Sequence, residues 1–404
     1  MYKCENCSSA LKYNIVTGKL QCEYCNACFP PYHFQTEQSA SQDTFETTTF
    51  TCSQCGAKII SEDTTLATFC SFCGTPAYLK GHTTRETCPK YIIPFYKTKE
   101  DCKKSYQKLF RFAPFTPNGL KDPESIENFR GIYMPYWLYS YKGALSEDEF
   151  SADASSSFAD DLSEAIAPFH TDRKKPFTPA YLSGFYADTN DVPSSVYHGG
   201  NPLGSLLERL HSSDAHADLA LFPVWFLSYR KGDRIAYAAV NGQTGKASAD
   251  FPIDEKKYIL GSLILAVPIF VFLSSFFTIK PPIVLLISAI LALLCAVISK
   301  KQLLRIQIKE SGQDDKGKMA SARFSSDTEY TIRKWPTLIK PVLAILLSAA
   351  IFILNPVADI YYYAGAIVCM CMVCWSFTDI FKYHNILATR KLPQFHERGG
   401  DEFA

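Results

Sequence analysis

The sequence carries almost no net charge. Its 404 residues include 41 Lys and Arg against 40 Asp and Glu, a balance of +1. A chain with this balance has no general electrostatic attraction for polyanions. Residues 1–90 also lack a basic excess, since they hold seven bases and eight acids. Because phosphate contacts dominate nucleic-acid affinity, we predict that this part of the chain contacts protein rather than nucleic acid.

The sequence shows no secretory leader at its start. Met1–Ala10 is polar and includes two cysteines, whereas a leader has an apolar stretch of about 7–15 residues. The whole chain has 15 cysteines. In a chain that is not secreted, this number indicates metal binding rather than disulfide bonds.

Four long stretches contain no charged residue: Tyr258–Thr278, Pro281–Ser299, Pro341–Ala358 and Ile360–Thr378. A helix needs roughly 20 apolar residues to cross a bilayer core of about 30 Å, so each stretch is long enough or nearly so. Lys280 and two prolines interrupt the first pair, and Asp359 interrupts the second. We therefore predict four transmembrane α-helices, as hairpins over residues 258–299 and 341–378. The alternative is a pair of buried helical hairpins in a soluble core, which four such stretches disfavour.

Basic residues indicate the orientation of these hairpins. Residues 300–340 carry ten Lys and Arg, and the tail over 379–404 adds four more. Cytoplasmic loops carry such an excess, so we predict a multi-pass cell-membrane protein whose N-terminus, basic loop and C-terminus are all cytoplasmic. The stretches lack ionisable residues except near their ends, whereas ion and proton pathways usually need them. The membrane part is therefore predicted to be an anchor rather than a transporter.

Eight cysteines form two copies of one pattern. Each copy reads C-x2-C, fourteen residues, C-x2-C, and the second lies 48 residues after the first: Cys4, Cys7, Cys22 and Cys25, then Cys52, Cys55, Cys70 and Cys73. Zinc binds four thiolates in a tetrahedron, and each C-x2-C turn supplies two of them. We predict two structural zinc ions, in ribbons over 1–34 and 50–90 joined by a flexible linker over 35–49. Redox C-x-x-C pairs and an iron–sulfur site are the alternatives, but the strand–helix context of a redox pair is missing.

A complete set of four thiolates leaves no position for water or substrate, so both zinc sites are predicted to be structural rather than catalytic. Metal binding would then supply the folding energy of each small ribbon. Cys28 is a possible substitute ligand for the first site. Around the second ribbon, Phe50, Phe69 and Phe72 could form a partner contact or a minimal core.

Residues 91–257 are predicted to form a soluble α+β domain with an antiparallel sheet. The expected elements are strands at 91–96 and 132–141, a helix at 99–112, a loop leading into a helix at 151–165, and a β-meander built from 219–229 and 234–240. Pro135 lies inside the second strand and suggests an edge position or a bulge. Asn241-Gly242 and Thr244-Gly245 are typical of turns.

No motif for catalysis stands out in this domain. The segment Gly242–Lys246 resembles a phosphate loop, but its spacing is not GxxxxGK[ST] and no helix is expected to follow. His170 near Asp172 could be a base with its orienting group, although a surface pair is the simpler interpretation. The remaining candidates are solvated histidines: His198, His211 and His216. We predict that the protein is not an enzyme.

Several sequence segments, taken together, resemble those of a known bacterial family. They are CENC…CEYC, CSQCG…CSFCG, GIYMPYWLY, YLSGFYAD, AVNGQTGK and LATRKLPQFHERGGDEFA, which span nearly the whole chain. The chain looks like the TFIIB-type zinc ribbon-containing membrane proteins, which are often labelled PriA-like helicases. The helicase label does not suit this sequence, because it has no Walker A motif. The resemblance carries the zinc-ligand role to the eight cysteines above and implies no catalytic residue.

The resemblance also implies partners. It indicates an integral membrane protein that works beside an SPFH (flotillin-like) protein and a phage-shock-type, ESCRT-III-like membrane-remodelling protein during envelope stress. The sequence therefore predicts a membrane scaffold that recruits partner proteins through its ribbons and its α+β domain. The alternative function is a membrane-tethered nucleic-acid-binding regulator. A membrane enzyme or transporter would need an open metal site or an ionisable group inside a span.

Overall fold

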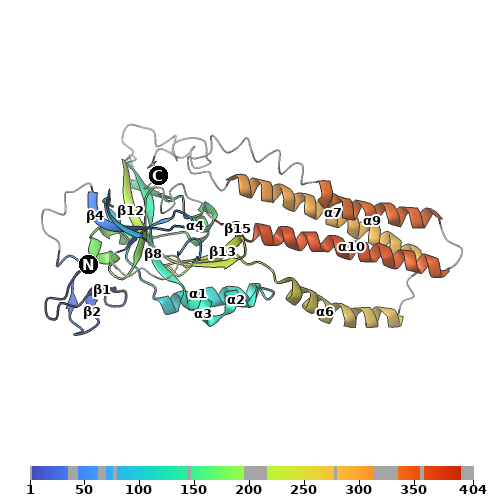
Figure 1. Ribbon diagram of the computed structural model, residues 1–404, viewed down its shortest axis with the longest axis horizontal. Helices are drawn as coiled ribbons and strands as arrows, with labels where there is room; N and C mark the ends of the chain where they lie inside the picture. The colour runs from blue at the N-terminus through green and yellow to red at the C-terminus, as the bar shows by residue number, and fades with distance from the viewer. Residues whose placement is uncertain are drawn as a thin grey trace. The chain divides into compact units, whose positions relative to one another are not determined.

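The computed structural model describes residues 2–34, 44–61, 70–75, 80–142, 147–194, 216–276, 280–312, 335–354 and 359–392. The chain divides into two compact units (Figure 1). The sheet unit consists of Met1–Pro114, Asn118–Asp250 and Arg390–Ala404, and the helical unit consists of Phe115–Pro117 and Phe251–Thr389. The helical unit is thus inserted into the sequence of the sheet unit.

The first part of the sheet unit is a small antiparallel sheet. It contains β1 (Leu11–Asn14), β2 (Lys19–Cys22) and β3 (Cys28–Phe29), in that order. Leu11, Tyr13 and Leu20 are buried, and Tyr13 packs on Tyr181, but these residues are too few to make a core of ordinary size. This three-stranded sheet therefore depends on something beyond apolar burial for its stability.

A 12-stranded sheet forms the rest of the unit. Its main path runs β10-β7-β12-β8-β11-β5-β4-β6, with β9 beside β8, β13 beside β12, and β14 and β15 beside β13. The strands not yet placed have these bounds: β4 Thr44–Thr51, β5 Lys58–Ser61, β6 Lys80–Thr87, β7 Tyr91–Ile92, β8 Arg130–Lys142, β9 Glu147–Asp153, β10 Lys175–Pro176, β11 Tyr186–Asp188, β12 His216–Lys231, β13 Arg234–Asn241, β14 Ala247–Ala249 and β15 Arg390–Lys391. Two pairs, β11 with β8 and β12 with β7, are parallel. The sheet is therefore mixed, and the prediction of an antiparallel sheet was wrong in this respect, because β8 and β7 are followed by long crossover segments.

The second ribbon is part of this large sheet. Its strand β4 pairs with both β5 and β6, and β5 also pairs with β11 through Ile60 and Ala187. Residues 44–49, which were predicted to lie in a flexible linker, belong to β4. The Thr-rich composition that suggested a linker also suits a strand, because Thr is β-branched.

Strand β8 lies inside the sheet, so Pro135 is not at an edge, which was one of the two positions predicted for it. β8 pairs with β12 along one side. On its other side, the residues of β8 up to Tyr133 pair with β11, and those from Tyr136 onward pair with β9. Pro135 falls between these two neighbours, where its carbonyl accepts a hydrogen bond from the Ala154 N–H at 2.8 Å. A proline is tolerated there because no ladder hydrogen bond needs its missing N–H.

Helices cover parts of this sheet. The first, α1 (Lys99–Leu109), begins at a capping box formed by Thr98 and Asp101, and the 3-10 helix η2 (Phe110–Phe112) continues it. The remaining short helices are α2 Asn118–Lys121, α3 Pro123–Glu127, α4 Asp160–Ile166, η3 Thr171–Arg173 and η4 Pro179–Leu182. The α4 helix packs on the core, where Tyr136 shares a hydrogen bond with Ser163 at 2.7 Å and stacks on Phe222 with ring centroids 4.4 Å apart.

The helical unit contains α6 (Glu255–Phe276), α7 (Pro281–Gly312), α9 (Trp335–Leu354) and α10 (Asp359–Leu387). Small buried residues, including Ala292, Cys295 and Ala344, lie where α7, α9 and α10 pack together. Lys340 of α9 forms an ion pair with Asp379 of α10 at 2.9 Å and also lies over the Trp375 ring. Three of the four helices therefore form a packed bundle with one ion pair between α9 and α10.

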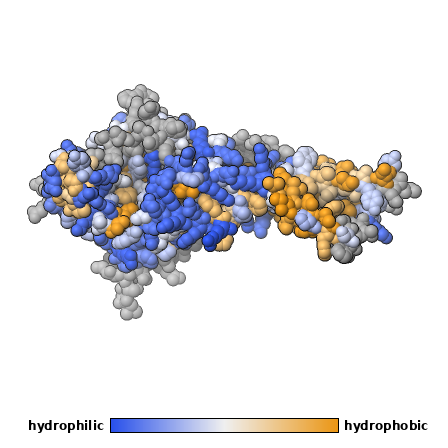
Figure 2. Space-filling view, turned by 90° about the horizontal axis from the view of Figure 1, so that it is seen from below, coloured by the Kyte–Doolittle hydropathy of each residue, from blue (hydrophilic) through white to orange (hydrophobic). Residues whose placement is uncertain are grey.

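Two helices of the described chain are long and apolar enough to cross a membrane: Pro281–Gln307 and Ile360–Leu387. Only 28% of the most apolar window of each is buried, whereas a core helix of a soluble protein is mostly buried. Ile339–Leu354 is a shorter apolar helix. By length and composition the structure thus provides two candidate spans rather than the four that were predicted. Figure 2 shows hydrophobic residues gathered over these helices.

Candidate metal centres

All four C-x2-C turns of the protein have the same backbone hydrogen bonds. In each turn, the N–H of the residue after the second cysteine donates to the carbonyl of the first cysteine. The four bonds are Ser8 to Cys4 at 2.8 Å, Asn26 to Cys22 at 3.0 Å, Gly56 to Cys52 at 2.8 Å and Gly74 to Cys70 at 3.0 Å. Each turn therefore directs two sulfur atoms to one side, as a metal knuckle requires.

The residue after each second cysteine has a left-handed backbone. The φ angle is 60° at Ser8 and 56° at Asn26 in the first ribbon, and 76° at Gly56 and 67° at Gly74 in the second. Glycine adopts this conformation without a steric penalty, and asparagine tolerates it better than most residues. The first ribbon therefore has the more strained turns, most of all at Ser8.

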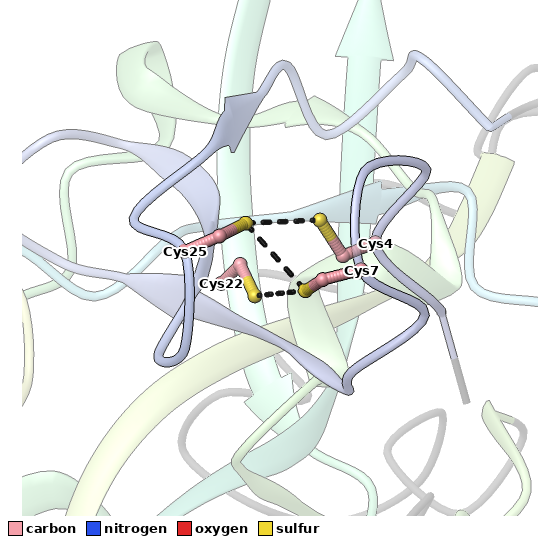
Figure 3. Close-up of side chains that lie close together, drawn as sticks. All are labelled: Cys4, Cys7, Cys22 and Cys25. Carbon is pink, nitrogen blue, oxygen red and sulfur yellow. Dashed lines mark hydrogen bonds between the residues drawn. The ribbon is translucent and has the colours of Figure 1, made fainter.

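The first centre brings Cys4, Cys7, Cys22 and Cys25 together (Figure 3). The Sγ–Sγ distances are 3.5 Å from Cys4 to Cys25, 3.4 Å from Cys7 to Cys22 and 3.6 Å from Cys7 to Cys25. A tetrahedron with zinc–sulfur bonds of about 2.3 Å has edges of about 3.8 Å, so a small outward shift of the sulfur atoms would accommodate the ion. The Cys25 side chain is exposed to solvent.

The second centre brings Cys52, Cys55, Cys70 and Cys73 together, and all four are buried. The Sγ–Sγ distance is 3.8 Å from Cys52 to Cys73 and 3.7 Å from Cys55 to Cys70. Both values match the edge of a zinc–thiolate tetrahedron. The second centre therefore fits zinc without any movement of these sulfur pairs.

The sulfur atoms of each group polarise one another. Hydrogen bonds from Cys55 and Cys70 lower the pKa of Cys52 to about 7, and hydrogen bonds from Cys52 and its neighbours lower the pKa of Cys73. In the first centre, a hydrogen bond from the Ser9 backbone lowers the pKa of Cys7 to about 6. Hydrogen bonds from neighbouring sulfur atoms raise the pKa of Cys55 and Cys70, and the pKa of Cys25 is raised as well. Each group thus divides into sulfur atoms that lose a proton readily and sulfur atoms that keep it, and a divalent cation would displace the remaining protons.

The other candidate residues from the sequence analysis are not among the cysteines of these two centres. Cys28 is exposed, and its sulfur lies 3.6 Å from the Asn26 carbonyl. Phe50 and Phe72 are buried, which favours the core interpretation for both. Phe69, His198 and His211 lie outside the described residues. The segment from Gly242 to Lys246 forms the turn between β13 and β14 rather than a phosphate loop.

Two supporting residues of the second centre could not be identified from the sequence. The Tyr237 hydroxyl donates to the Phe72 carbonyl at 2.7 Å, inside the C-x2-C turn of Cys70 and Cys73. The Arg390 guanidinium lies over the Tyr237 ring, 5.8 Å from its centroid. Neither residue is close to the cysteines in sequence, so no local pattern could have indicated them.

Arg390 is held by two carboxylates. Its Nη2 donates to both oxygens of Asp161 at 2.7 and 2.8 Å, and its Nε donates to Asp250 at 3.3 Å. The Arg390 side chain is buried and Asp250 is nearly so, whereas Asp161 is more than half exposed. Arg390 therefore fixes β15 to the sheet beside the residues that support the second centre.

A buried acid lies on β11, the strand that pairs with β5 of the second ribbon. The Asp188 carboxylate accepts hydrogen bonds from Ser155 Oγ at 2.5 Å, from Ser157 Oγ and from the Thr189 N–H. Burial raises the pKa of Asp188 to about 7 in spite of these bonds. Protonation of this carboxyl group therefore contributes to the stability of the folded sheet around β11, the strand beside the second ribbon.

The comparisons with known proteins give one informative likeness. No family model matches the chain, and no solved structure matches it. The chain is similar to the uncharacterized protein YdjG of Bacillus subtilis (strain 168). The two are 26% identical over 310 residues, which cover 63% of this chain and 91% of that protein. This likeness and the two four-cysteine groups are compatible with the zinc-ribbon family resemblance, and the name of the relative assigns no activity.

The arrangement determines what the centres can do chemically. Four thiolates complete a tetrahedron, so an ion held there would have no open position for water or substrate. The zinc-ligand role of the eight cysteines stays a prediction, and the geometry of both groups fits it. An ion in each group would hold two C-x2-C turns at a fixed separation.

Proposed function

We propose that this protein is a multi-pass membrane scaffold whose zinc-stabilised ribbons recruit partner proteins. The observation that carries the proposal is the combination of two four-thiolate groups with helices whose large apolar side chains face outward. The first feature suits a rigid binding surface, and the second suits a bilayer. With an ion bound, neither four-cysteine centre would have an open metal position or a free thiolate for catalysis.

Exposed apolar side chains support membrane insertion. Large apolar side chains on three helices are more than half exposed. They are Leu263, Ile264 and Phe270 on α6, Leu286 and Leu293 on α7, and Ile353 on α9. A soluble surface rarely exposes such a large apolar area. We propose that α6, α7, α9 and α10 all cross the bilayer, with the N-terminus, the basic loop and the C-terminus in the cytoplasm.

The ribbons are proposed to act as the docking surface. Cys25 of the first centre is exposed, and residues 1–90 as a whole carry no basic excess that would favour nucleic acid. A partner held beside the bilayer gains effective concentration for a second contact with the membrane or with another protein. By family resemblance, the partners are an SPFH (flotillin-like) protein and a phage-shock-type, ESCRT-III-like protein that act in envelope stress.

A crosslinked pull-down from membranes tests this proposal. The structure favours removing residues 1–34 alone, because β4, β5 and β6 belong to the large sheet and their loss would disrupt it. The double substitution Cys4→Ser with Cys7→Ser provides a finer variant. Cys371→Ser with Cys374→Ser in α10 is the matched control, since both thiols are exposed and lie outside the two centres.

We expect the intact chain and the α10 control to capture an SPFH or phage-shock-type protein. The two ribbon variants should lose it while staying in the membrane fraction. Capture of nucleic acid in a salt-sensitive manner would replace the scaffold with a tethered regulator. Recovery of the chain in the soluble fraction would refute the membrane part of the proposal.

A further inference from the structure

The exposed face of α1 and η2 combines three cations with an aromatic ring. Lys104, Lys108 and Arg111 are spaced at i, i+4 and i+7, and Phe112 follows directly. Residues at this spacing lie on one side of a helix. All four side chains are exposed, and Phe112 is 89% exposed. Cys102 and Tyr106, on the opposite side, are buried.

The three cations are not neutralised by ion pairs within the described residues. Glu127 instead forms ion pairs with Lys99 at 3.6 Å and Lys103 at 2.5 Å. Asp101, one turn before Lys104, hydrogen-bonds with the backbone and hydroxyl of Thr98 in the capping box. Glu100, four residues before Lys104, is an exposed acid on the same side of α1. The face with Lys104, Lys108 and Arg111 therefore presents a net positive charge to its surroundings.

A single exposed phenylalanine is common on protein surfaces and needs no explanation by itself. The position of Phe112 in the chain makes it informative. Three residues later, the Phe115 carbonyl accepts a hydrogen bond from the Asp254 N–H at 2.8 Å, and the Phe115 ring lies 5.1 Å from that of Tyr258. Phe115 is thereby held against the first turns of α6.

Thr116 adds to this attachment. Its carbonyl accepts a hydrogen bond from Lys257 Nζ at 2.7 Å. Lys257 and Tyr258 are the types of residue that mark a membrane interface, and the apolar part of α6 begins directly after them. Covalent geometry limits the reach from Phe112 to Phe115 to about 11 Å. If α6 enters the bilayer near Tyr258, Phe112 lies within that reach of the interface.

We propose that Lys104, Lys108, Arg111 and Phe112 form a binding surface for the anionic headgroups of the cytoplasmic leaflet. The cations would contact lipid phosphates, and the Phe112 ring would enter the boundary between headgroups and acyl chains. This inference rests on the proposed insertion of α6 into the membrane. Nucleic acid is a weaker fit, because three cations are far fewer than the phosphate contacts of a typical nucleic-acid-binding protein.

Photocrosslinking of the full-length chain in vesicles tests the inference. The photoreactive residue p-benzoylphenylalanine replaces Phe112, and the vesicles contain either phosphatidylcholine alone or phosphatidylcholine with phosphatidylglycerol. We expect lipid adducts at position 112 that increase several-fold with the anionic lipid. Replacing Lys104, Lys108 and Arg111 by Gln should reduce these adducts at least about fivefold, because each base near an anionic surface adds to the attraction.

Two further probe positions make the outcomes distinct. A probe at Phe270, which is exposed on α6, should form lipid adducts in both kinds of vesicle. A probe at Tyr24 of the first ribbon, which is 81% exposed, tests whether exposure alone is sufficient and should form few adducts.

Adducts at Phe270 without adducts at Phe112 would overturn the inference while the membrane proposal stands. Absence of adducts at both positions would refute membrane insertion itself. Adducts from Phe112 to another protein chain would show that a protein covers this face, and would also overturn the inference. Equal amounts of lipid adduct at Phe112 and Tyr24 would mean that exposure alone accounts for the crosslinking, and would also overturn the inference.

Discussion

The two four-cysteine centres share one spacing and one hydrogen-bond pattern, but their surroundings differ. The first belongs to a three-stranded sheet with few buried residues, and Cys25 is open to solvent. The second is buried inside a cluster that also contains Phe226 and Tyr237 of the large sheet. The same ligand pattern can therefore stabilise a small ribbon that contacts the rest of the sheet unit through a few residues, such as Tyr13 against Tyr181, or serve as one part of a larger core.

Removal of each centre should have different consequences for the fold. Cys55→Ser with Cys73→Ser should unfold much of the sheet unit, because structural zinc contributes about 10–16 kcal/mol and a domain has only about 5–15 kcal/mol of net stability. Cys7→Ser with Cys25→Ser should unfold the first ribbon alone. Zinc content and hydrogen exchange of β8 and β12 measure both effects. Equal loss of protection in the two variants would refute the contrast.

Arg390→Met should destabilise the surroundings of the second centre by about 3 kcal/mol. Removal of one partner of a buried ion pair leaves the other without compensation, and the exposure of Asp161 keeps the expected loss at the low end of the usual range. Lys175→Met, at an exposed position on β10 of the same sheet, is the control and should change stability by less than about 0.5 kcal/mol. Denaturant unfolding measures both, and the zinc affinity of the first centre should be the same in each variant.

The stability of the sheet unit should depend on pH through Asp188. Its pKa is raised from 3.8 to about 7 in the folded protein, so the folded state binds the extra proton in this range. Stability from this group is complete below about pH 4 and decreases as the pH rises to about 7, by up to about 4 kcal/mol. Asp188→Asn should remove this slope. Unfolding curves of the two proteins across that range give the difference, and parallel pH profiles would contradict the prediction.

Glycine substitutions should separate backbone strain from metal binding. Gly74→Ala places a side chain at φ 67°, where its Cβ would meet only ordinary contacts, and should destabilise by about 1–2 kcal/mol. Gly232→Ala, at φ 65° in the turn between β12 and β13, should have a similar effect on stability. Only Gly74→Ala should weaken zinc binding, as measured by competition with a chelator. Equal zinc affinities would show that the turn does not position the ligands.

The reverse change is expected in the first centre. Ser8→Gly should relieve the left-handed strain at φ 60° and stabilise the first ribbon by up to about 1 kcal/mol. The same competition assay should show tighter binding of one zinc ion per chain. Weaker binding would mean that the Ser8 side chain contributes more than its backbone strain removes.

Local patterns in the sequence predicted local structure well. The cysteine spacing identified both groups, and the turn residues between β12 and β14 marked the β-meander. The helix predicted over 99–112 is present as α1 and η2, and its capping box is visible in the sequence as Thr98 and Asp101. Each of these features depends on residues only a few positions apart.

Long-range pairing could not be predicted in the same way. β5 pairs with β11 more than 120 residues later, so no local pattern indicates that the second ribbon belongs to the large sheet. The position of Pro135 between two strands depends on where β9 and β11 end. Arg390 forms an ion pair with Asp161, which lies 229 residues earlier in the sequence. Such pairings depend on the three-dimensional arrangement and leave no periodic signal in the chain.

The place of β15 in the sequence sets the order in which the protein can be completed during synthesis. Arg390 pairs with Ile235 of β13, and the residues between them include every helix of the helical unit. At about 5–20 residues per second, a ribosome needs roughly 8–30 s to synthesise that interval. Asp161 and Asp250 therefore emerge well before their arginine, and the sheet receives its last strand only after all four hydrophobic helices have left the ribosome.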